Sequence, residues 1–396
     1  MSTPQQFPAS ERRVDLDWVR IGAFGLLIFY HVGMLYVSWD FHIKSAHRLT
    51  WLEPVMLLLN PWRLSLLFLV SGFASRFMLR KYHLGAFIRS RSARLLIPLV
   101  FGMLVIVPPQ SYLQIVEALG YPAGFADFYT RHYLAFGSQF CPNPCIVLPT
   151  WNHLWFVVYL WVYTVALVGL LWPWPALADR LGTRLAALLA GPWVLIVPCL
   201  LFVVWRRFLF PAFPSTHALF GDWYNHADYA TAFLIGFLLA QQDSVWRGIE
   251  RQRWIALVAA ATLFALFIGV RAGLLAPSLV PRWFASAAYG CYQWLAMAAV
   301  LGFARRHFTA DGPVRRYLTD AIFPYYIVHQ TAIIMIAHAL RGSGLSAGGE
   351  AAIVIGGTVL TCIATYEAVR RIAWLRPLFG LRLEVRRPAG LAQQPA

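Results

Sequence analysis

The chain has 396 residues, of which 59% are hydrophobic and only 13% are charged, and its mean hydropathy is +0.59. This composition excludes an ordinary soluble globular protein and a disordered chain, and it indicates a polytopic membrane protein. The net charge is +16, and the basic residues lie mainly between apolar segments. No nucleic-acid-binding motif accompanies them, so we expect them to contact membrane lipids and not nucleic acid.

The N-terminal stretch is polar and short, and it leads directly into the first apolar run. This run contains Arg20 and lacks the small-residue pattern of a cleavage site, so we interpret it as a retained first helix that follows a cytoplasmic segment, residues 1–13. Further apolar runs approach the thickness of a bilayer. We predict an all-α polytopic integral membrane protein with about ten transmembrane helices, at 18–39, 52–78, 95–113, 154–172, 185–205, 229–241, 254–275, 283–304, 323–340 and 351–369.

The basic residues between the runs test this topology. With a cytoplasmic N-terminus, the inner segments hold 23 Lys and Arg residues and the outer segments hold 9. This asymmetry follows the positive-inside rule, so we expect both termini in the cytoplasm and the protein in the inner, cytoplasmic membrane. We expect residues 14–381 to form one membrane domain and residues 382–396 a disordered tail, and residues 81–94 are a basic inner segment expected along the membrane surface as an amphipathic helix.

Two of the five cysteines lie outside the apolar runs. Cys141 and Cys145 flank a Pro-Asn-Pro turn in the longest outer loop, 117–150. A disulfide between them would suit an oxidising compartment, whereas two thiols supply only half of a tetrahedral metal site, so we predict no metal centre. The sequence leaves open whether the disulfide forms.

The first apolar run carries two polar residues at helical spacing. Arg20 and His31 are 11 positions apart, which places them within about 20° on one helical face and about 16 Å apart in depth. Such a face should look into protein or a polar cavity, and Asp15 and Asp17 stand where they can hold Arg20. A near-neutral His31 can act as a base. The alternative is that Arg20 snorkels to the interface and His31 is a hydrogen-bonded packing residue.

Two further groups permit a functional and a structural interpretation. Arg91 and Arg94 share one helical face and precede an apolar run. They can clamp the phosphates of a soluble anionic donor, or they can contact lipid phosphates as ordinary inner charges. Ser71 and Gly72 interrupt a spanning helix with two small residues, which indicates close helix packing or space for a narrow ligand arm.

Other polar residues lie within or beside the later runs. His153 begins the fourth run among tryptophans, as an interfacial residue or as a contact for a polar acceptor. His329 and Gln330 lie inside the ninth run, where polar groups need partners. Glu367 is expected to pair with an arginine three or four residues later. The chain has no P-loop, dinucleotide-type glycine motif, HExxH motif or nucleophile elbow, which argues against an ATP-driven pump and a serine hydrolase.

Taken in order, these segments resemble the membrane acyltransferase-3 family. The resemblance extends from about Val14 to Leu381, and the DWYN and LRPLFGL segments are most similar to the branch that contains glucans biosynthesis protein C. The segments that carry it are Arg20 followed after ten residues by His31, LVSGF at 69–73, Arg91 and Arg94 before LLIPL, HLWFVVYL at 153–160 and FPYYIVHQ at 323–330.

The resemblance implies a ten-helix enzyme that moves an acyl group from cytoplasmic acyl-CoA to a hydroxyl of a carbohydrate or another envelope molecule. It implies that Arg20 and His31 are the essential pair and that Arg91 and Arg94 match an RxxR element. The branch suggests a glucan acceptor and a succinyl donor without establishing either. No tightly bound cofactor is implied, because acyl-CoA is a substrate.

We therefore predict acyl transfer with His31 as base, Arg20 in positioning or charge stabilisation, and Arg91 and Arg94 on the donor phosphates. Direct transfer and an acyl-histidine intermediate both remain open, as do the acyl group, the acceptor and the oligomeric state. The main alternative is a secondary transporter or flippase for an anionic metabolite or lipid-linked sugar, and a receptor or scaffold is a third. Secondary candidates are Ser71 and Gly72 for the donor and Asp17, His153, His329, Gln330 and Glu367 for a polar site.

Overall fold

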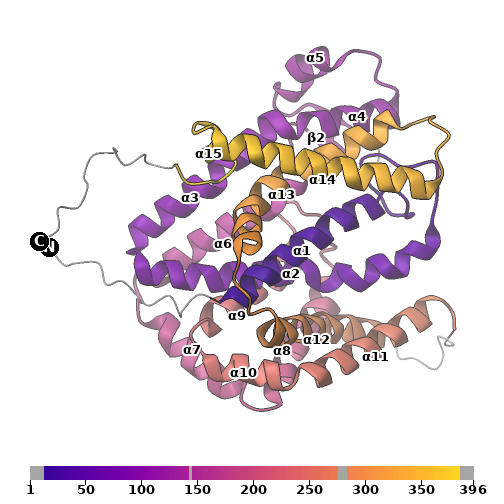
Figure 1. Cartoon of the computed structure of the whole chain (residues 1–396). Helices are drawn as coiled ribbons and strands as arrows, with labels where there is room; N and C mark the ends of the chain where they lie inside the picture. The colour runs from indigo at the N-terminus through magenta and orange to yellow at the C-terminus, as the bar shows by residue number, and fades with distance from the viewer. Residues whose placement is uncertain (1–12, 142–144, 275–282, 384–396) are drawn as a thin grey trace, which may run out of the picture.

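The chain folds as a bundle of helices with one short β-hairpin (Figure 1). The computed structural model describes residues 13–141, 145–274 and 283–383. The fold confirms the predicted all-α membrane class. The α-helices are α1 Val14–Gly33, α2 Glu53–Lys81, α3 Leu84–Phe101, α4 Pro108–Leu119, α5 Phe125–Phe128, α6 Trp155–Leu171, α7 Leu177–Leu188, α8 Trp193–Val204, α9 Trp223–Leu239, α10 Asp243–Arg251, α11 Arg253–Arg271, α12 Phe284–His307, α13 Pro313–Ala339, α14 Ala347–Arg371 and α15 Leu375–Leu378. Short 3-10 or π segments are η2 Thr50–Leu52, η3 Gly102–Ile106, η4 Tyr129–Tyr133, η5 Asn152–Leu154 and η6 Trp205–Leu209, and the strands are β1 Gln139–Phe140 and β2 Ile146–Val147.

Each predicted span coincides with helix in the structure. Within the described ranges, eight stretches are long and apolar enough to cross a membrane. The fifth predicted span corresponds to α7 and α8–η6, which are bent by 107° and count as a ninth span if taken together. The sixth corresponds to α9, which has 17 residues. The basic inner segment 81–94, expected to be an amphipathic helix, is mostly helical, since α2 ends at Lys81 and α3 begins at Leu84.

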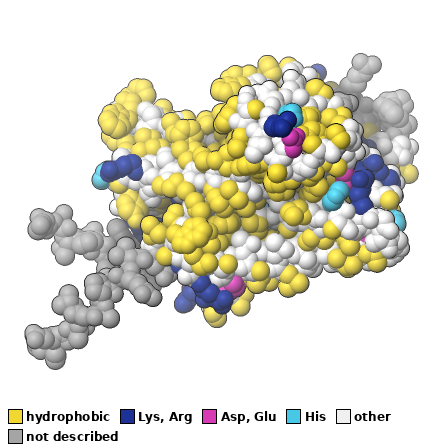
Figure 2. Space-filling model, turned by 90° about the horizontal axis from the view of Figure 1, so that it is seen from above, with side chains coloured by type: hydrophobic (Ala, Val, Ile, Leu, Met, Phe, Trp, Pro, Cys, Tyr) yellow, Lys and Arg dark blue, Asp and Glu magenta, His cyan; other side chains and the backbone are white. Residues whose placement is uncertain are grey.

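The helices divide into an interior group and a peripheral group. α2, α6, α12 and α13 are mostly buried, whereas α11 and α14 are mostly exposed. The exposed residues of α11 include Trp254, Ile255 and Val258, which suits contact with lipid tails. Figure 2 shows a face dominated by hydrophobic side chains, with the Lys and Arg side chains in a few separate groups. α1 packs against α2, α12 and α13, so the helix with the Arg20 and His31 pair lies within the bundle.

Close packing of α2 on α9 explains the small residues in the LVSGF segment. A Cβ atom on Gly72 would lie 1.9 Å from the carbonyl oxygen of Phe233, and one on Gly236 would lie 1.9 Å from that of Leu69. The two glycines let the helix backbones touch. The space beside Gly72 is therefore filled by α9 and leaves no room for a donor arm. Ser71 takes part in the same helix, where its carbonyl oxygen accepts from Ser75 Oγ at 2.8 Å.

A broken span, α3–η3–α4, owes its shape to prolines. Pro108 has no N–H, so the carbonyl of Leu104 lacks its helical partner, and Tyr129 Oη donates to it at 3.0 Å. The N–H of Val107 bonds to Gly102 in a π turn, which releases the carbonyl of Met103 for Tyr133. The β-hairpin after η4 carries the Cys141–Cys145 disulfide that the sequence left open. Outer-segment side chains thus complete the hydrogen bonding of this span.

Candidate active site

A pair of histidines forms the centre of the site. His31 Nδ1 lies 2.8 Å from His329 Nε2, and the two rings are nearly coplanar at 12°. His329 Nδ1 lies 2.7 Å from the carbonyl oxygen of Tyr326. Because a carbonyl only accepts, neutral His329 carries its proton on Nδ1 and must accept at Nε2. His31 therefore donates from Nδ1 and keeps a lone pair on Nε2, which has no hydrogen-bond partner among the described residues.

His153 joins the same site from η5. Its Nε2 donates to the carbonyl of Ile327 at 3.0 Å, and Gln110 Nε2 approaches its Nδ1 at 3.3 Å. Its ring stands at 89° to that of His329, with centroids 5.2 Å apart. Tyr326 Oη donates to the carbonyl of His153. His153 is thus a buried member of the polar network. It does not lie in an interfacial belt, which was one of the two interpretations of its sequence position.

A series of side-chain amides extends this network from α13 to α4 and to the segment after α1. Gln330 Nε2 donates to Gln110 Oε1 at 3.1 Å and to His42 Nε2 at 2.8 Å. His42 Nδ1 donates to Gln114 Oε1 at 2.5 Å, and Asn152 Nδ2 donates to Gln110 at 3.1 Å. All these hydrogen bonds can form when the imidazole rings are neutral. The structure therefore brings His31, His153, His329 and Gln330 together as the polar centre of the bundle.

The segment after α1 positions His42. Lys44 Nζ donates to the carbonyls of Met34, Val37 and Trp39 at 2.6, 2.7 and 2.5 Å, which ties down the turn that ends the helix. Burial lowers the pKa of Lys44 to about 8 and lowers the pKa of His42 below its usual value. The first helix ends at Gly33, earlier than the predicted Trp39, so His31 lies in its last turn.

A narrow apolar cavity runs between α1 and α13. It has a volume of about 160 Å³ and is lined on α1 by residues from Ile21 to Ile28 and on α13 by residues from Leu318 to His329. One end thus lies next to Arg20 in the sequence, and the other end reaches the partner of His31. The cavity follows the helical face on which Arg20 and His31 were predicted to lie.

Three arginines gather at the Arg20 end. Arg20, Arg91 and Arg94 are close enough to repel one another, and Arg20 also donates to the carbonyl of Thr319 at 3.1 Å. Arg91 is buried, and its Nε and Nη2 atoms have no hydrogen-bond partner in the described part of the chain. Mutually repelling guanidinium groups of this kind favour an anionic ligand, and their planar forks match phosphate oxygens.

Two other predicted residues serve the scaffold. Asp17 forms an ion pair with Arg315, a fully buried arginine at the start of α13 that also pairs with Asp311. Glu367 bonds to Arg370 at 3.2 Å and Arg371 at 2.9 Å, as predicted. It also accepts from Tyr317, so it links α14 to α13. We assign Asp17 and Glu367 to helix docking.

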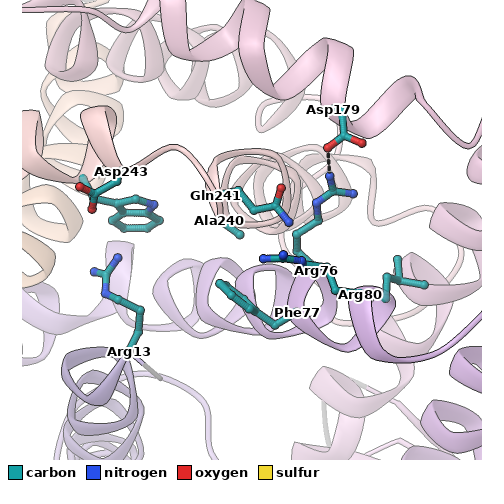
Figure 3. Close-up of a pocket in the computed structure, with 10 residues that line it drawn as sticks. Arg13, Arg76, Phe77, Arg80, Asp179, Ala240, Gln241 and Asp243 are labelled. Carbon is teal, nitrogen blue, oxygen red and sulfur yellow. Dashed lines mark hydrogen bonds and ion pairs between the residues drawn. The ribbon is translucent and has the colours of Figure 1, made fainter. Parts of the chain in front are cut away.

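A wider cavity lies at the helix ends near Arg13 (Figure 3). It has a volume of about 680 Å³, and its lining includes Arg76 and Arg80 of α2 and Trp246 of α10. Arg76 pairs with Asp179, and the guanidinium of Arg13 lies 4.9 Å from the Trp246 ring. Its described lining does not include the three arginines or the histidine pair. The apolar cavity between α1 and α13, and not this one, has His329, the partner of His31, in its lining.

Sequence reasoning did not find several members of the site. Gln110, His42 and Arg63 are not among the site residues that the sequence predicts. Arg63 lies inside α2 with 3% of its surface exposed. The signal that could have found Gln110 and Arg63 is the presence of a polar side chain within an apolar span.

A relayed histidine base, an apolar channel and a cluster of arginines together suit transfer of a group from an anionic carrier. A family model described as an acyltransferase domain matches residues 13–367. The chain belongs to the acyltransferase-3 family.

Relatives within the acyltransferase-3 family carry a common name. Glucans biosynthesis protein C of Escherichia coli O6:K15:H31 (strain 536 / UPEC) is 26% identical over 159 residues, which are 40% of this chain and 39% of that protein. The protein of the same name from E. coli strain K12 is 25% identical over the same shares. The match thus spans about two fifths of the length of these relatives. No solved structure matches the chain.

Membership of the acyltransferase-3 family confirms the resemblance found in the sequence. The chain is thus a multi-pass membrane member of the acyltransferase-3 family.

Proposed function

We propose that this acyltransferase moves an acyl group from cytoplasmic acyl-CoA to a hydroxyl of a carbohydrate or another envelope molecule. The observation that carries the proposal is the apolar cavity between α1 and α13, whose lining extends from Ile21, the neighbour of Arg20 in the sequence, to His329, the partner of His31. A coenzyme A thioester combines a polyanionic head with a flexible narrow arm, so it matches both ends of this path.

The donor binds with its phosphates on Arg91, Arg94 and Arg20. The unpartnered nitrogens of Arg91 supply donors for phosphate oxygens. The arm then lies in the cavity along α1 and presents the thioester near His31. Arg20 positions the donor where head and arm meet. Burial of the arm between two helices excludes water, which limits hydrolysis of the thioester.

The chemical step uses the lone pair on His31 Nε2. It takes the proton of the acceptor hydroxyl as that oxygen attacks the thioester carbonyl, and a tetrahedral oxyanion forms. The imidazolium is held by His329, which still accepts from His31 Nδ1. Collapse of the intermediate breaks the C–S bond, and the leaving thiolate takes the proton from Nε2. The products are the ester and free CoA.

The acceptor side follows from the orientation proposed for the bundle. With both termini in the cytoplasm of the inner membrane, the arginine cluster faces inward and His31 lies toward the outer side. The name of the relatives favours a glucan as the acceptor, and a succinyl group is the finer donor proposal. Membrane lipids surround the domain, and residues 14–381 comprise the membrane unit.

Labelled transfer tests this function. Purified protein in liposomes is incubated with radiolabelled short acyl-CoA thioesters and a glucan oligosaccharide, and both CoA release and labelled ester are measured. We expect turnover by the wild type and its loss in His31→Asn, which is matched in polarity. Retained turnover in a folded His31→Asn protein contradicts the assignment. Flux of substrate into liposomes without any ester formation would favour the transporter alternative.

A further inference from the structure

A buried arginine of α2 lies near His31 and has no role in the acyl transfer as proposed so far. Arg63 lies in α2 with 3% of its surface exposed, and two of its nitrogens, Nε and Nη1, are buried. Neither nitrogen has a hydrogen-bond partner among the residues that the structure describes. A cation left in this state is costly in the interior of a membrane protein, so the site is built for a negative charge that comes and goes.

The position of Arg63 connects it to the reaction centre. Its Cζ atom lies 3.5 Å from the centroid of the Tyr30 ring, and that ring is 6.1 Å from the ring of His31. Tyr30 Oη donates to Asn60 Oδ1 at 3.0 Å, which fixes the ring under the guanidinium. Arg63 is also close enough to His31 to act on it electrostatically. Two consecutive residues of α1 thus link the base to a cation on α2.

Other charges near Arg63 do not neutralise it. The groups that interact with it electrostatically are mainly phenols, those of Tyr30, Tyr229 and Tyr289. The buried carboxylate in the neighbouring helix, Asp228, is instead held by Ser65 Oγ at 2.8 Å and Gln293 Nε2 at 2.8 Å. Arg63 forms no ion pair with a described carboxylate within 4.0 Å.

We propose that Arg63 is a further catalytic residue, which binds the carbonyl oxygen of the transferred acyl group and stabilises the oxyanion formed on attack. This inference rests on the proposed acyl transfer. As the acceptor oxygen bonds to the carbonyl carbon, the C=O electron pair moves to the oxygen, where Nε–H and Nη1–H donate to it. The pair returns when the C–S bond breaks, and Arg63 keeps its proton throughout.

Arginine variants test the assignment in the full-length protein in liposomes, with the acyl-CoA thioester that turns over fastest in the wild type. We expect Arg63→Gln to lower kcat about 100- to 1,000-fold, the usual cost of a lost oxyanion donor, while the Kd for CoA changes less than threefold. Arg63→Lys keeps the charge but loses the fork, so its kcat should lie at least tenfold below the wild type and above that of Arg63→Gln. The exposed Arg207→Met is the control, with kcat within twofold.

The outcomes separate the two proposals. A kcat of Arg63→Gln within threefold of the wild type overturns the role of Arg63 and leaves the acyl transfer intact. Absence of transfer by the wild type, despite binding of CoA, overturns both. If Arg63→Gln does not fold, as judged by its melting temperature and elution profile, Arg63→Lys decides alone. A tenfold loss of kcat with an unchanged Kd supports the proposal, and a kcat within threefold of the wild type overturns it.

Discussion

The polarity of the histidine pair follows from one backbone carbonyl. The carbonyl oxygen of Tyr326 can only accept a hydrogen bond, and this fixes the tautomers of His329 and then of His31. In the resulting arrangement the ring nitrogen of the pair that makes no bond to His329 or Tyr326, Nε2 of His31, carries a lone pair. A base oriented by a second group is the arrangement on which hydroxyl activation generally relies.

Replacing His329 tests this relay. We expect His329→Ala to lower kcat about 100-fold or more, because His31 Nδ1–H loses its acceptor and the productive tautomer is no longer favoured. His329→Gln should recover part of the rate, since an amide oxygen can accept from Nδ1. Steady-state kinetics with labelled donor measure both.

The double replacement of His31 and His329 is the control for the relay. If the residues act as a unit, the double variant should be no slower than His31→Ala alone. Multiplicative losses, or equal rates for the Ala and Gln variants at position 329, would contradict the relay.

His42 gives the outer network a dependence on pH. Burial lowers its pKa below the usual value of 6.5, so the folded protein prefers the neutral ring, which accepts from Gln330. This contribution to stability is present above pH 6.5 and is lost as the pH falls through the lower folded pKa. We expect the melting temperature to fall from pH 7.5 to 5 less steeply in His42→Gln than in the wild type. Equal slopes would contradict the role of His42.

Polar residues of the site that lie in apolar spans are easier to predict from the sequence than the residues to which they hydrogen-bond. Arg20, His31, His329 and Gln330 stand out because polar groups are rare in hydrocarbon. Their contacts join positions about 300 residues apart, such as His31 and His329, which spacing within one segment does not reveal. Glu367 could be assigned because its partners lie within one helical turn.

At the scale of elements, α1 lines the apolar cavity in which we propose that the donor arm lies. Gly25 lines this cavity, and a Cβ atom added there would meet nothing within 4 Å. A larger side chain can therefore enter the cavity without displacing a neighbouring helix. The cavity itself was not visible from the sequence, because apolar residues that line a void and apolar residues that pack together look alike.

Filling the cavity tests its role. We expect Gly25→Leu to raise the donor KM at least tenfold, because the added side chain occupies the path of the arm, while helix stability is kept or improved. Gly22→Leu is the matched control, since Gly22 is exposed on the same helix and its Cβ also meets nothing within 4 Å. Kinetics over a range of donor concentrations distinguish the two. Similar KM values for Gly25→Leu and the wild type would show that the donor takes another path.

The broken span α3–η3–α4 carries groups for both ends of the site. Arg91 and Arg94 lie near its start, and Gln110 and Gln114 lie beyond its prolines. The prolines in its sequence predict an interruption, but not which side chains bond to the released carbonyls. Tyr129 and Tyr133, which bond to two of these carbonyls, come from the segment that follows the span. Thr331 of α13 donates a hydrogen bond to the carbonyl of Ile106 at 2.8 Å.

For the whole molecule, apolar length and loop charge predicted the fold class and the position of every helix that could span the membrane. They did not predict the 107° bend between α7 and α8, since it depends on how neighbouring helices pack, whereas the short sixth run already indicated a short α9. The bundle surrounds the histidine pair with helices from both halves of the chain. The wide arginine-lined cavity near Arg13 is the rival place for an anionic donor.

A structure of the protein with a non-transferable acyl-CoA analogue tests the central claim most directly. We expect phosphates on Arg91 and Arg94, the arm between α1 and α13, and the acyl carbonyl carbon within about 4 Å of the position that an acceptor oxygen takes at His31 Nε2. Density for the analogue in the cavity lined by Arg13, Arg76 and Arg80, with its acyl end far from His31, would contradict it.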